Sequence, residues 1–150
     1  MPVAACRYTG GVRPRYTALP QSRLLEANRE PAPLIRDLSA AVQAAGLAVD
    51  RSSPAEGYLE TRWFDVSRRI SVGPPFDGLD RTVKIRFYAD RIQGRTRLLA
   101  ECVQRIAWDP SLPERELERV VPEGHAGRIL LDSLVAPFIA DSTRPQAPLP

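Results

Sequence analysis

The residues with the most specific chemistry lie at the start of the chain, where Val3-Ala4-Ala5-Cys6 has the form of a bacterial lipobox. In such a sequence, small residues lead to a cysteine that becomes a lipidated N-terminus after signal-peptide cleavage. A complete signal needs a basic segment and an apolar stretch of roughly 7 to 15 residues before the cleavage site. The lipid-attachment hypothesis for Cys6 therefore places the start of translation upstream of Met1 or treats this sequence as trimmed. The alternative is a coincidental match in an alanine-rich chain.

The other reactive residue types do not form a catalytic or metal-binding pattern. His125 is the only histidine and lies between Gly124 and Gly127, so neither a pair of histidine ligands nor a catalytic triad built on two histidines is available. The segment from Glu114 to Arg119 alternates acidic and basic residues, which favours a solvated charged face over paired general acids. We therefore expect no enzyme activity, no cofactor and no metal.

Length and composition favour one domain with a core large enough to fold on its own. The chain has 150 residues, within the range of a single domain. No apolar run reaches the 18 or more residues that a transmembrane helix requires, so any membrane attachment must be covalent or peripheral. The net charge is +3, but Lys84 is the only lysine. This bias toward arginine, with abundant alanine, suggests a GC-rich genome more than a selected basic surface.

The chain divides into a tether, a core and a tail. Residues 1–33 are rich in Gly, Pro and Arg without a sustained apolar period, which predicts a lipobox-like start and a flexible linker. Within this linker, Leu24 and Leu25 could form a short helix, and Arg13 and Tyr16 could dock on a partner or simply belong to a solvated spacer. Residues 34–140 are expected to form a single α+β domain, and the proline-containing residues 141–150 a disordered tail.

Apolar spacing predicts a helix near each end of this domain. The first is indicated by Leu34, Ile35, Leu38, Ala41, Val42 and Ala45, with Pro33 near its start and Gly46 as its stop. The last follows Pro122 and carries a broad apolar stripe ending at Phe138, with a kink expected at Pro137. A strand begins at residues 47–49, and residues 58–66 predict a second strand with Leu59, Thr61 and Trp63 on one face.

Two long strands should meet at a two-residue turn, Gln93-Gly94. Placing Ile92 opposite Arg95 fixes the register of every other pair. Asp90 then faces Arg97 and Arg86 faces Glu101 as opposite-charge pairs, while Phe87 faces Ala100 and Ile85 faces Cys102 on the other face of the sheet. In this register Cys102 is a small buried hydrophobe and not a nucleophile.

These elements together predict an antiparallel sheet with the N-terminal and C-terminal helices packed on one face, because that arrangement buries both apolar stripes. The loop at residues 73–80 contains Pro74, Pro75 and Gly78, which exclude a central strand there.

Three segments carry a resemblance to a known family. Leu59-Glu60-Thr61-Arg62-Trp63, Arg69-Ile70-Ser71-Val72 and Thr82-Val83-Lys84-Ile85 resemble the core of the BamC (NlpB) lipoproteins. The resemblance covers roughly residues 34–140 and implies a helix-grip fold, with helices held in a curved antiparallel sheet. It also implies a lipid anchor in the outer membrane, a periplasmic location and a role beside the machinery that assembles outer-membrane proteins. One such domain is expected here, where that family carries two.

Three functions from different classes follow. The first is a non-enzymatic envelope lipoprotein that binds envelope or outer-membrane proteins, with Trp63, Phe76, Tyr88 and Arg62 as interaction candidates and an apolar patch at its surface. The second is a small apolar ligand held between helix and sheet, with Trp63, Phe64, Phe76 and Phe87 lining the cavity.

The third is a cytoplasmic domain with a nucleic-acid or regulatory partner. A basic patch beside aromatic residues would support nucleic-acid binding, and its members would be Arg62, Arg68, Arg69, Lys84 and Arg86. Nucleic acid is an unlikely partner because the hairpin register already neutralises Arg86.

Overall fold

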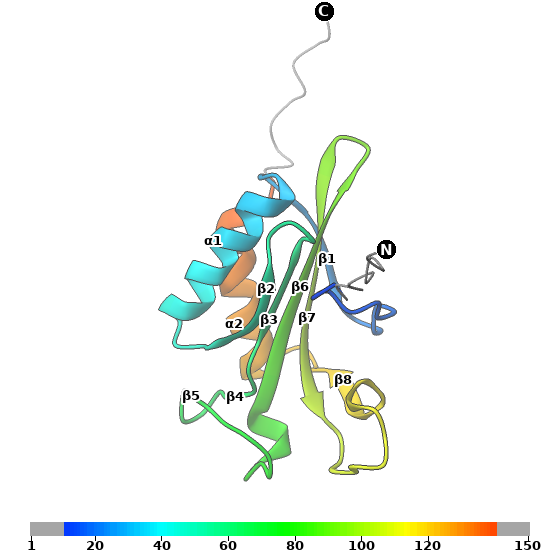
Figure 1. Cartoon of the computed structure of the whole chain (residues 1–150). Coiled ribbons are helices and arrows are strands. Elements are labelled where there is room, and N and C mark those ends of the chain that lie inside the picture. The colour runs from blue at the N-terminus through cyan, green and yellow to red at the C-terminus, as the bar shows by residue number, and fades with distance from the viewer. Residues whose placement is uncertain (1–10, 141–150) are drawn as a thin grey trace, which may run out of the picture.

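The computed structural model describes residues 11–140, which form one antiparallel sheet with two α-helices beside it (Figure 1). The strands run β1-β7-β6-β3-β2 across the sheet, β4 extends the β6 side together with β5, and β8 pairs with β7. The expected α+β class with an antiparallel sheet is confirmed. The element bounds are β1 Arg23–Ala27, α1 Pro31–Ala44, β2 Val49–Ser53, β3 Tyr58–Thr61, β4 Phe64–Asp65, β5 Ile70–Ser71, β6 Thr82–Ile92, β7 Arg95–Arg105, β8 Glu118–Val120 and α2 Ala126–Val135.

The β6–β7 hairpin has the register that the sequence predicts. Ile92 pairs with Arg95, and every pair expected further along the two strands is present. Gln93 and Gly94 both have positive φ, 51° and 77°, as a type I′ turn requires. Because side chains alternate along a strand, this register assigns each residue of both strands to one face.

The two faces of the sheet differ in polarity along β6. On β6, Val83, Ile85, Phe87 and Ala89 belong to the main apolar core, which also holds buried side chains of α1 and α2. We call this side the inner face. The residues between them on β6 point to the opposite side, which we call the outer face, and they are Lys84, Arg86, Tyr88 and Asp90.

The first helix forms as the apolar pattern predicts. Leu34, Ile35, Leu38 and Val42 are fully buried along one side of α1, and Gly46, with φ of 92°, follows the helix where a left-handed residue ends it. The helix begins three residues earlier than the predicted domain start, at Pro31.

The second helix begins with the only histidine of the chain. The His125 Nδ1 atom accepts a hydrogen bond from the Gly127 backbone N–H at 2.9 Å, so this imidazole caps α2. Gly127 lies close to the inner face, because a Cβ atom built on it would be 2.9 Å from Cys102 Sγ and from Val83 Cγ1. The helix ends at Val135 and continues as a 3₁₀ turn at Ala136–Phe138, which accords with the break expected at Pro137.

The predicted flexible tether is wrong over its last part. Arg23–Ala27 is not linker but β1, which pairs with β7 from Arg23 opposite Ala100 to Ala27 opposite Thr96. Leu25 packs against the main core and Ala27 belongs to it, while Leu24 lies on the outer side. The strand also excludes the short helix considered for Leu24 and Leu25.

The predicted strand over residues 58–66 is also wrong in part, because it breaks at Arg62. Leu59 joins the main core, whereas Trp63 joins a separate apolar cluster with Val103 and Val120. After the break, β4 places the Asp65 side chain in a buried position, where it accepts hydrogen bonds from Ser67, Arg68 and Arg81. The hydrogen bonds from Ser67 and Arg68, which follow Asp65 closely in the chain, hold the β4–β5 turn in place.

Replacing Gly127 by alanine tests the close approach of α2 to the sheet. Alanine favours a helix by about 1 kcal/mol over glycine, but the added Cβ must displace two packed side chains. We expect Gly127→Ala to lower the free energy of unfolding by about 1 to 3 kcal/mol, measured by urea denaturation. The double variant Gly127→Ala/Cys102→Ala should lose less than the sum of the two single variants. A stabilised Gly127→Ala protein would contradict the packing described here.

Candidate functional site

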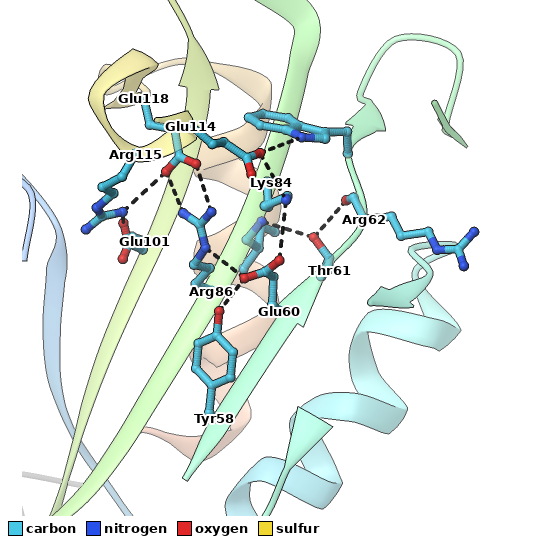
Figure 2. Close-up of polar contacts among 12 residues, drawn as sticks. Tyr58, Glu60, Thr61, Arg62, Lys84, Arg86, Glu101, Glu114, Arg115 and Glu118 are labelled. Atoms are coloured by element: carbon cyan, nitrogen blue, oxygen red, sulfur yellow. Dashed lines mark hydrogen bonds and ion pairs between the residues drawn. The ribbon is translucent and has the colours of Figure 1, made fainter. Parts of the chain in front are cut away.

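The outer face is built around the buried guanidinium group of Arg86, which is 1% exposed. Its Nε atom donates to Glu60 Oε2 at 3.0 Å. Its two terminal nitrogens donate to the two oxygens of Glu118 at 2.5 and 2.8 Å, the bidentate geometry that a guanidinium offers a carboxylate. Figure 2 shows β6 carrying Arg86 between the glutamate of β3 and the glutamate of β8.

Two further cations extend this charge network. Arg115 donates to Glu101 Oε2 at 2.6 Å and lies 3.3 Å from Glu118 Oε2. On the other side, Lys84 contacts Glu60 at 3.4 Å and Glu114 at 3.3 Å. Glutamates and cations thus alternate across four strands and the 3₁₀ turn at Glu114–Leu117. With Arg105, which lies 3.6 Å from Glu114, four cations face four glutamates, so the network can be buried without an uncompensated ion.

The network holds Glu60 in the charged form. Burial alone would raise the pKa of Glu60, but a hydrogen bond from the Tyr58 hydroxyl and the charges of Lys84 and Arg86 outweigh it and lower that pKa to about 2. The pKa of Arg86 is raised because its two glutamate partners outweigh its desolvation. None of these groups is therefore ready to exchange a proton near neutral pH.

The predicted ion pairs of the hairpin are wrong in their partners, although the register is right. Arg86 faces Glu101 across the ladder but bonds to Glu60 and Glu118 instead. Asp90 faces Arg97 but bonds to Arg13, through both oxygens at 2.8 Å. Glu118 binds Arg86 through two parallel hydrogen bonds, and Arg13 binds Asp90 in the same way. In each case the bidentate partner comes from a segment remote in sequence and not from the cross-strand neighbour.

The prediction of a solvated charged face over residues 114–119 holds for Glu116 and Arg119, which are exposed, but is wrong for Glu118. The side chains of Glu118 and Glu101 are 0% exposed. β8 brings Glu118 onto the sheet beside β7, so a segment that looks like an exposed helical turn supplies the central carboxylate of the network.

Residues 11–22, which we call the N-terminal segment, cover part of the outer face. Arg13 binds Asp90 and also donates to the Glu56 carbonyl oxygen at 2.9 Å. The Tyr16 ring lies over two guanidinium groups, 5.3 Å from that of Arg86 and 4.6 Å from that of Arg115. Such contacts are cation–π interactions. The segment expected to be a flexible linker is therefore attached to the outer face through Arg13 and to the network through Tyr16.

An aromatic and arginine cluster lies at the end of the network near β4. The Arg105 guanidinium is 5.7 Å from the Trp63 ring, 5.8 Å from Phe76 and 5.0 Å from Trp108. The Trp63 indole N–H donates to Glu114 at 3.1 Å, which links the cluster to the network. Trp63 is buried, whereas Trp108 is 54% exposed.

Two exposed aliphatic side chains lie in the same β7-to-β8 connection as Trp108. Ile106 is 51% exposed and Leu112 is 44% exposed. We call Arg105, Ile106, Trp108 and Leu112 the Trp108 surface. Trp and Arg are the residue types that most often dominate binding energy in protein interfaces.

The structure brings together only part of the predicted set of interaction residues. Trp63 and Phe76 contact each other with ring centroids 5.3 Å apart. Tyr88 lies elsewhere on the outer face, against Tyr58 at 5.2 Å. Arg62 is exposed and points away from the network in Figure 2. Cys6, the predicted lipid-attachment residue, lies outside the described residues, as does the predicted tail.

The residue sets of the two alternative functions are not brought together either. Phe64 and Phe87 belong to the main core, but Trp63 and Phe76 belong to the outer cluster, so the four aromatics do not line one cavity. In the candidate basic patch, Lys84 and Arg86 are buried and paired.

Among residues 11–140, Cys102 and groups of metal-ligating side chains were two candidates for reactive sites. Burial raises the pKa of the Cys102 thiol, as expected for an unreactive cysteine, and its predicted burial is confirmed at 0% exposed. No cluster of His, Cys, Asp and Glu in the described part of the chain could hold a metal ion. Across the same residues, every helix is too short or too polar to cross a membrane.

Arg105 and Trp108 were missed by sequence reasoning, although a signal is present. Ile106 and Trp108 lie between the end of a predicted strand and the turn-forming pair Asp109-Pro110. Large apolar residues in such a connection are candidates for an exposed loop. The role of Arg13 carries no such signal, because its partner Asp90 is 77 residues away.

Comparison with known proteins yields no relative for this chain: it matches no protein-family model and no curated protein. The likeness to the BamC lipoproteins and to a helix-grip fold stays a prediction from the residues that carry it.

The pKa of Glu60 gives a test of the network. A folded-state pKa of about 2, below the ordinary value of about 4.3, stabilises the protein at pH values above 4.3. That contribution, about 3 kcal/mol, is lost as the pH falls from about 5 toward 2. Urea unfolding across this range should show the loss, and a ¹³C titration of the Glu60 carboxyl should give its pKa directly. Glu123, an exposed residue, is the control. A Glu60 that titrates together with Glu123 would contradict the network.

Proposed function

We propose that this chain is a non-enzymatic lipoprotein of the bacterial envelope. In this proposal Cys6 carries the lipid that anchors the protein to the periplasmic face of the outer membrane. The folded domain binds another envelope protein. The lipobox-like sequence at residues 3–6 supports the anchor, and the Trp108 surface supports the binding function.

The single observation that carries the binding function is the exposure of Trp108 beside an immobilised cation. Arg105 is held between Trp63, Phe76 and Trp108 and lies 3.6 Å from Glu114. A tryptophan packed on such a group is fixed in position before a partner arrives, so little side-chain entropy is lost on binding. With Ile106 and Leu112 exposed in the same connection between β7 and β8, the surface suits a partner that supplies apolar side chains.

The resemblance to the BamC lipoproteins suggests where such a partner acts. If the partner is an outer-membrane protein or a component that assembles such proteins, the lipid anchor and the Trp108 surface both promote binding to that partner. The anchor then raises the local concentration of the domain at the membrane where its partner resides.

The anchor is tested by expressing the gene with its native upstream region, as wild type and as Cys6→Ala. We expect metabolic labelling with a lipid precursor and retention in the membrane fraction for the wild type, and loss of both in Cys6→Ala. Cys102→Ala is the matched control and should keep both. An unlabelled, soluble wild-type protein would refute the anchor and favour the cytoplasmic alternative.

The binding surface is tested by a photo-crosslinking amino acid placed at position 108 in cells. We expect one discrete adduct with an envelope protein, identified by mass spectrometry, and at least a tenfold weaker adduct when Ile106→Ser and Leu112→Ser are added. The same amino acid at Ile129, an exposed position on α2, serves as the control. An equal yield of the same adduct from both positions would rule out a specific role of the Trp108 surface.

A further inference from the structure

A groove on the outer face lies between the N-terminal segment and the sheet, near the β6–β7 turn. Its volume is about 660 Å³, within the range of small-molecule sites. Tyr88 and Leu99 of the central hairpin and Leu24 of β1 line it from the sheet. Tyr16 and Arg15 line it from the N-terminal segment.

The apolar part of the groove is more exposed than is usual for its residue types. Leu24 is 59% exposed and Tyr16 is 39% exposed. A second hollow of about 270 Å³ shares Leu24 and Arg97 with the groove and reaches Ile92, which is 37% exposed. The two hollows adjoin at Leu24 and Arg97, so exposed apolar surface continues beside the groove toward Ile92.

The charges of the groove are unequal. Asp90 is fully engaged by Arg13, which takes both of its oxygens, and Glu56 accepts a hydrogen bond from the Val12 backbone N–H at 2.9 Å. Two more arginines line the groove, Arg15 and Arg97, and among residues 11–140 neither forms an ion pair with a carboxylate. The lining therefore carries one more positive charge than negative charge.

We propose that this groove binds an anionic amphiphile, a molecule with a single alkyl or acyl chain and a carboxylate or phosphate head group. The unpaired guanidinium groups of Arg15 and Arg97 receive the head group, since a guanidinium binds either anion through two parallel hydrogen bonds. The chain lies along Leu99 and Leu24, which line the same groove. This site is separate from the Trp108 surface and does not depend on the lipid anchor.

The experiment is a titration of the full chain followed by backbone amide NMR. The probes are decanoate, decyl phosphate and the neutral decyl maltoside, each kept below its aggregation concentration. We expect saturable shifts at Tyr88, Leu99 and Leu24 with the two anionic probes, and at least tenfold weaker binding of the maltoside. The tighter of the two anionic probes identifies the head group as carboxylate or phosphate.

Two variants and two matched controls locate the site. Arg97→Gln should weaken binding of the tighter anionic probe by about tenfold, the effect of losing a hydrogen bond to a charged group. Leu24→Gln should weaken it by about fivefold through lost apolar contact. Arg62→Gln and Ile129→Gln change exposed residues outside the groove and should leave affinity unchanged. All four positions are exposed, so each variant should keep the dispersed spectrum of the folded chain.

Three results would overturn the proposal. One is the absence of saturable binding by either anionic probe. Another is binding that Arg97→Gln and Leu24→Gln leave unchanged, or that the neutral maltoside matches. The last is a shift of the same amides by an acidic peptide when neither amphiphile shifts them, which would make the groove a site for a protein segment. None of these results bears on Cys6 or on Trp108, so the envelope function is tested separately.

Discussion

The outer face depends on one constraint, which is that Arg86 is buried in its charged form. A guanidinium cannot lose its proton to avoid the cost of leaving water, so the fold must surround it with carboxylates. β3 supplies Glu60 and β8 supplies Glu118, and the two strands lie on opposite sides of the hairpin that carries Arg86. Removing either partner would leave a buried charge without compensation, which costs several kcal/mol. The positions of β3 and β8 are thus coupled through a single side chain, in addition to the backbone pairing of the sheet.

The same constraint explains why the chain before β1 is part of the folded unit. Tyr16 lies over the guanidinium groups of Arg86 and Arg115, and the Thr17 carbonyl oxygen accepts a hydrogen bond from Arg115 at 2.8 Å. A covering ring keeps water from the charges, and lower water access strengthens each ion pair beneath it. The N-terminal segment therefore contributes to the network, although its sequence is typical of a linker. The Trp108 surface adjoins this network through Trp63 and Glu114, whereas the groove lies between the N-terminal segment and the sheet.

The sequence predicts those elements whose evidence is local. The helix stripes of α1 and α2 and the register of the β6–β7 hairpin follow from spacing within one segment, and a two-residue turn determines every cross-strand pair. The misplaced β1 and the unexpected burial of Glu118 depend on remote residues. β1 is short and carries only Leu25 and Ala27 toward the core, too few to show an apolar period. Likewise, the sequence around Glu118 is typical of an exposed charged segment, and the burial of Glu118 follows only from the pairing of β8 with β7. Local pattern gave the cross-strand neighbours correctly, but ion-pair partners are chosen by three-dimensional geometry.

Competition between Arg13 and Arg97 for Asp90 shows how the choice of ion-pair partner shapes the groove that we propose as a binding site. Asp90 and Arg97 are direct neighbours across the hairpin, and a salt bridge between them would satisfy both. Arg13 instead takes both oxygens of Asp90 and also reaches the Glu56 carbonyl, so three hydrogen bonds replace the cross-strand pair. With both oxygens of Asp90 bonded to Arg13, Arg97 forms no ion pair among the described residues. The contact that fastens the N-terminal segment to the sheet is therefore also the contact that leaves a free cation in the groove beneath that segment.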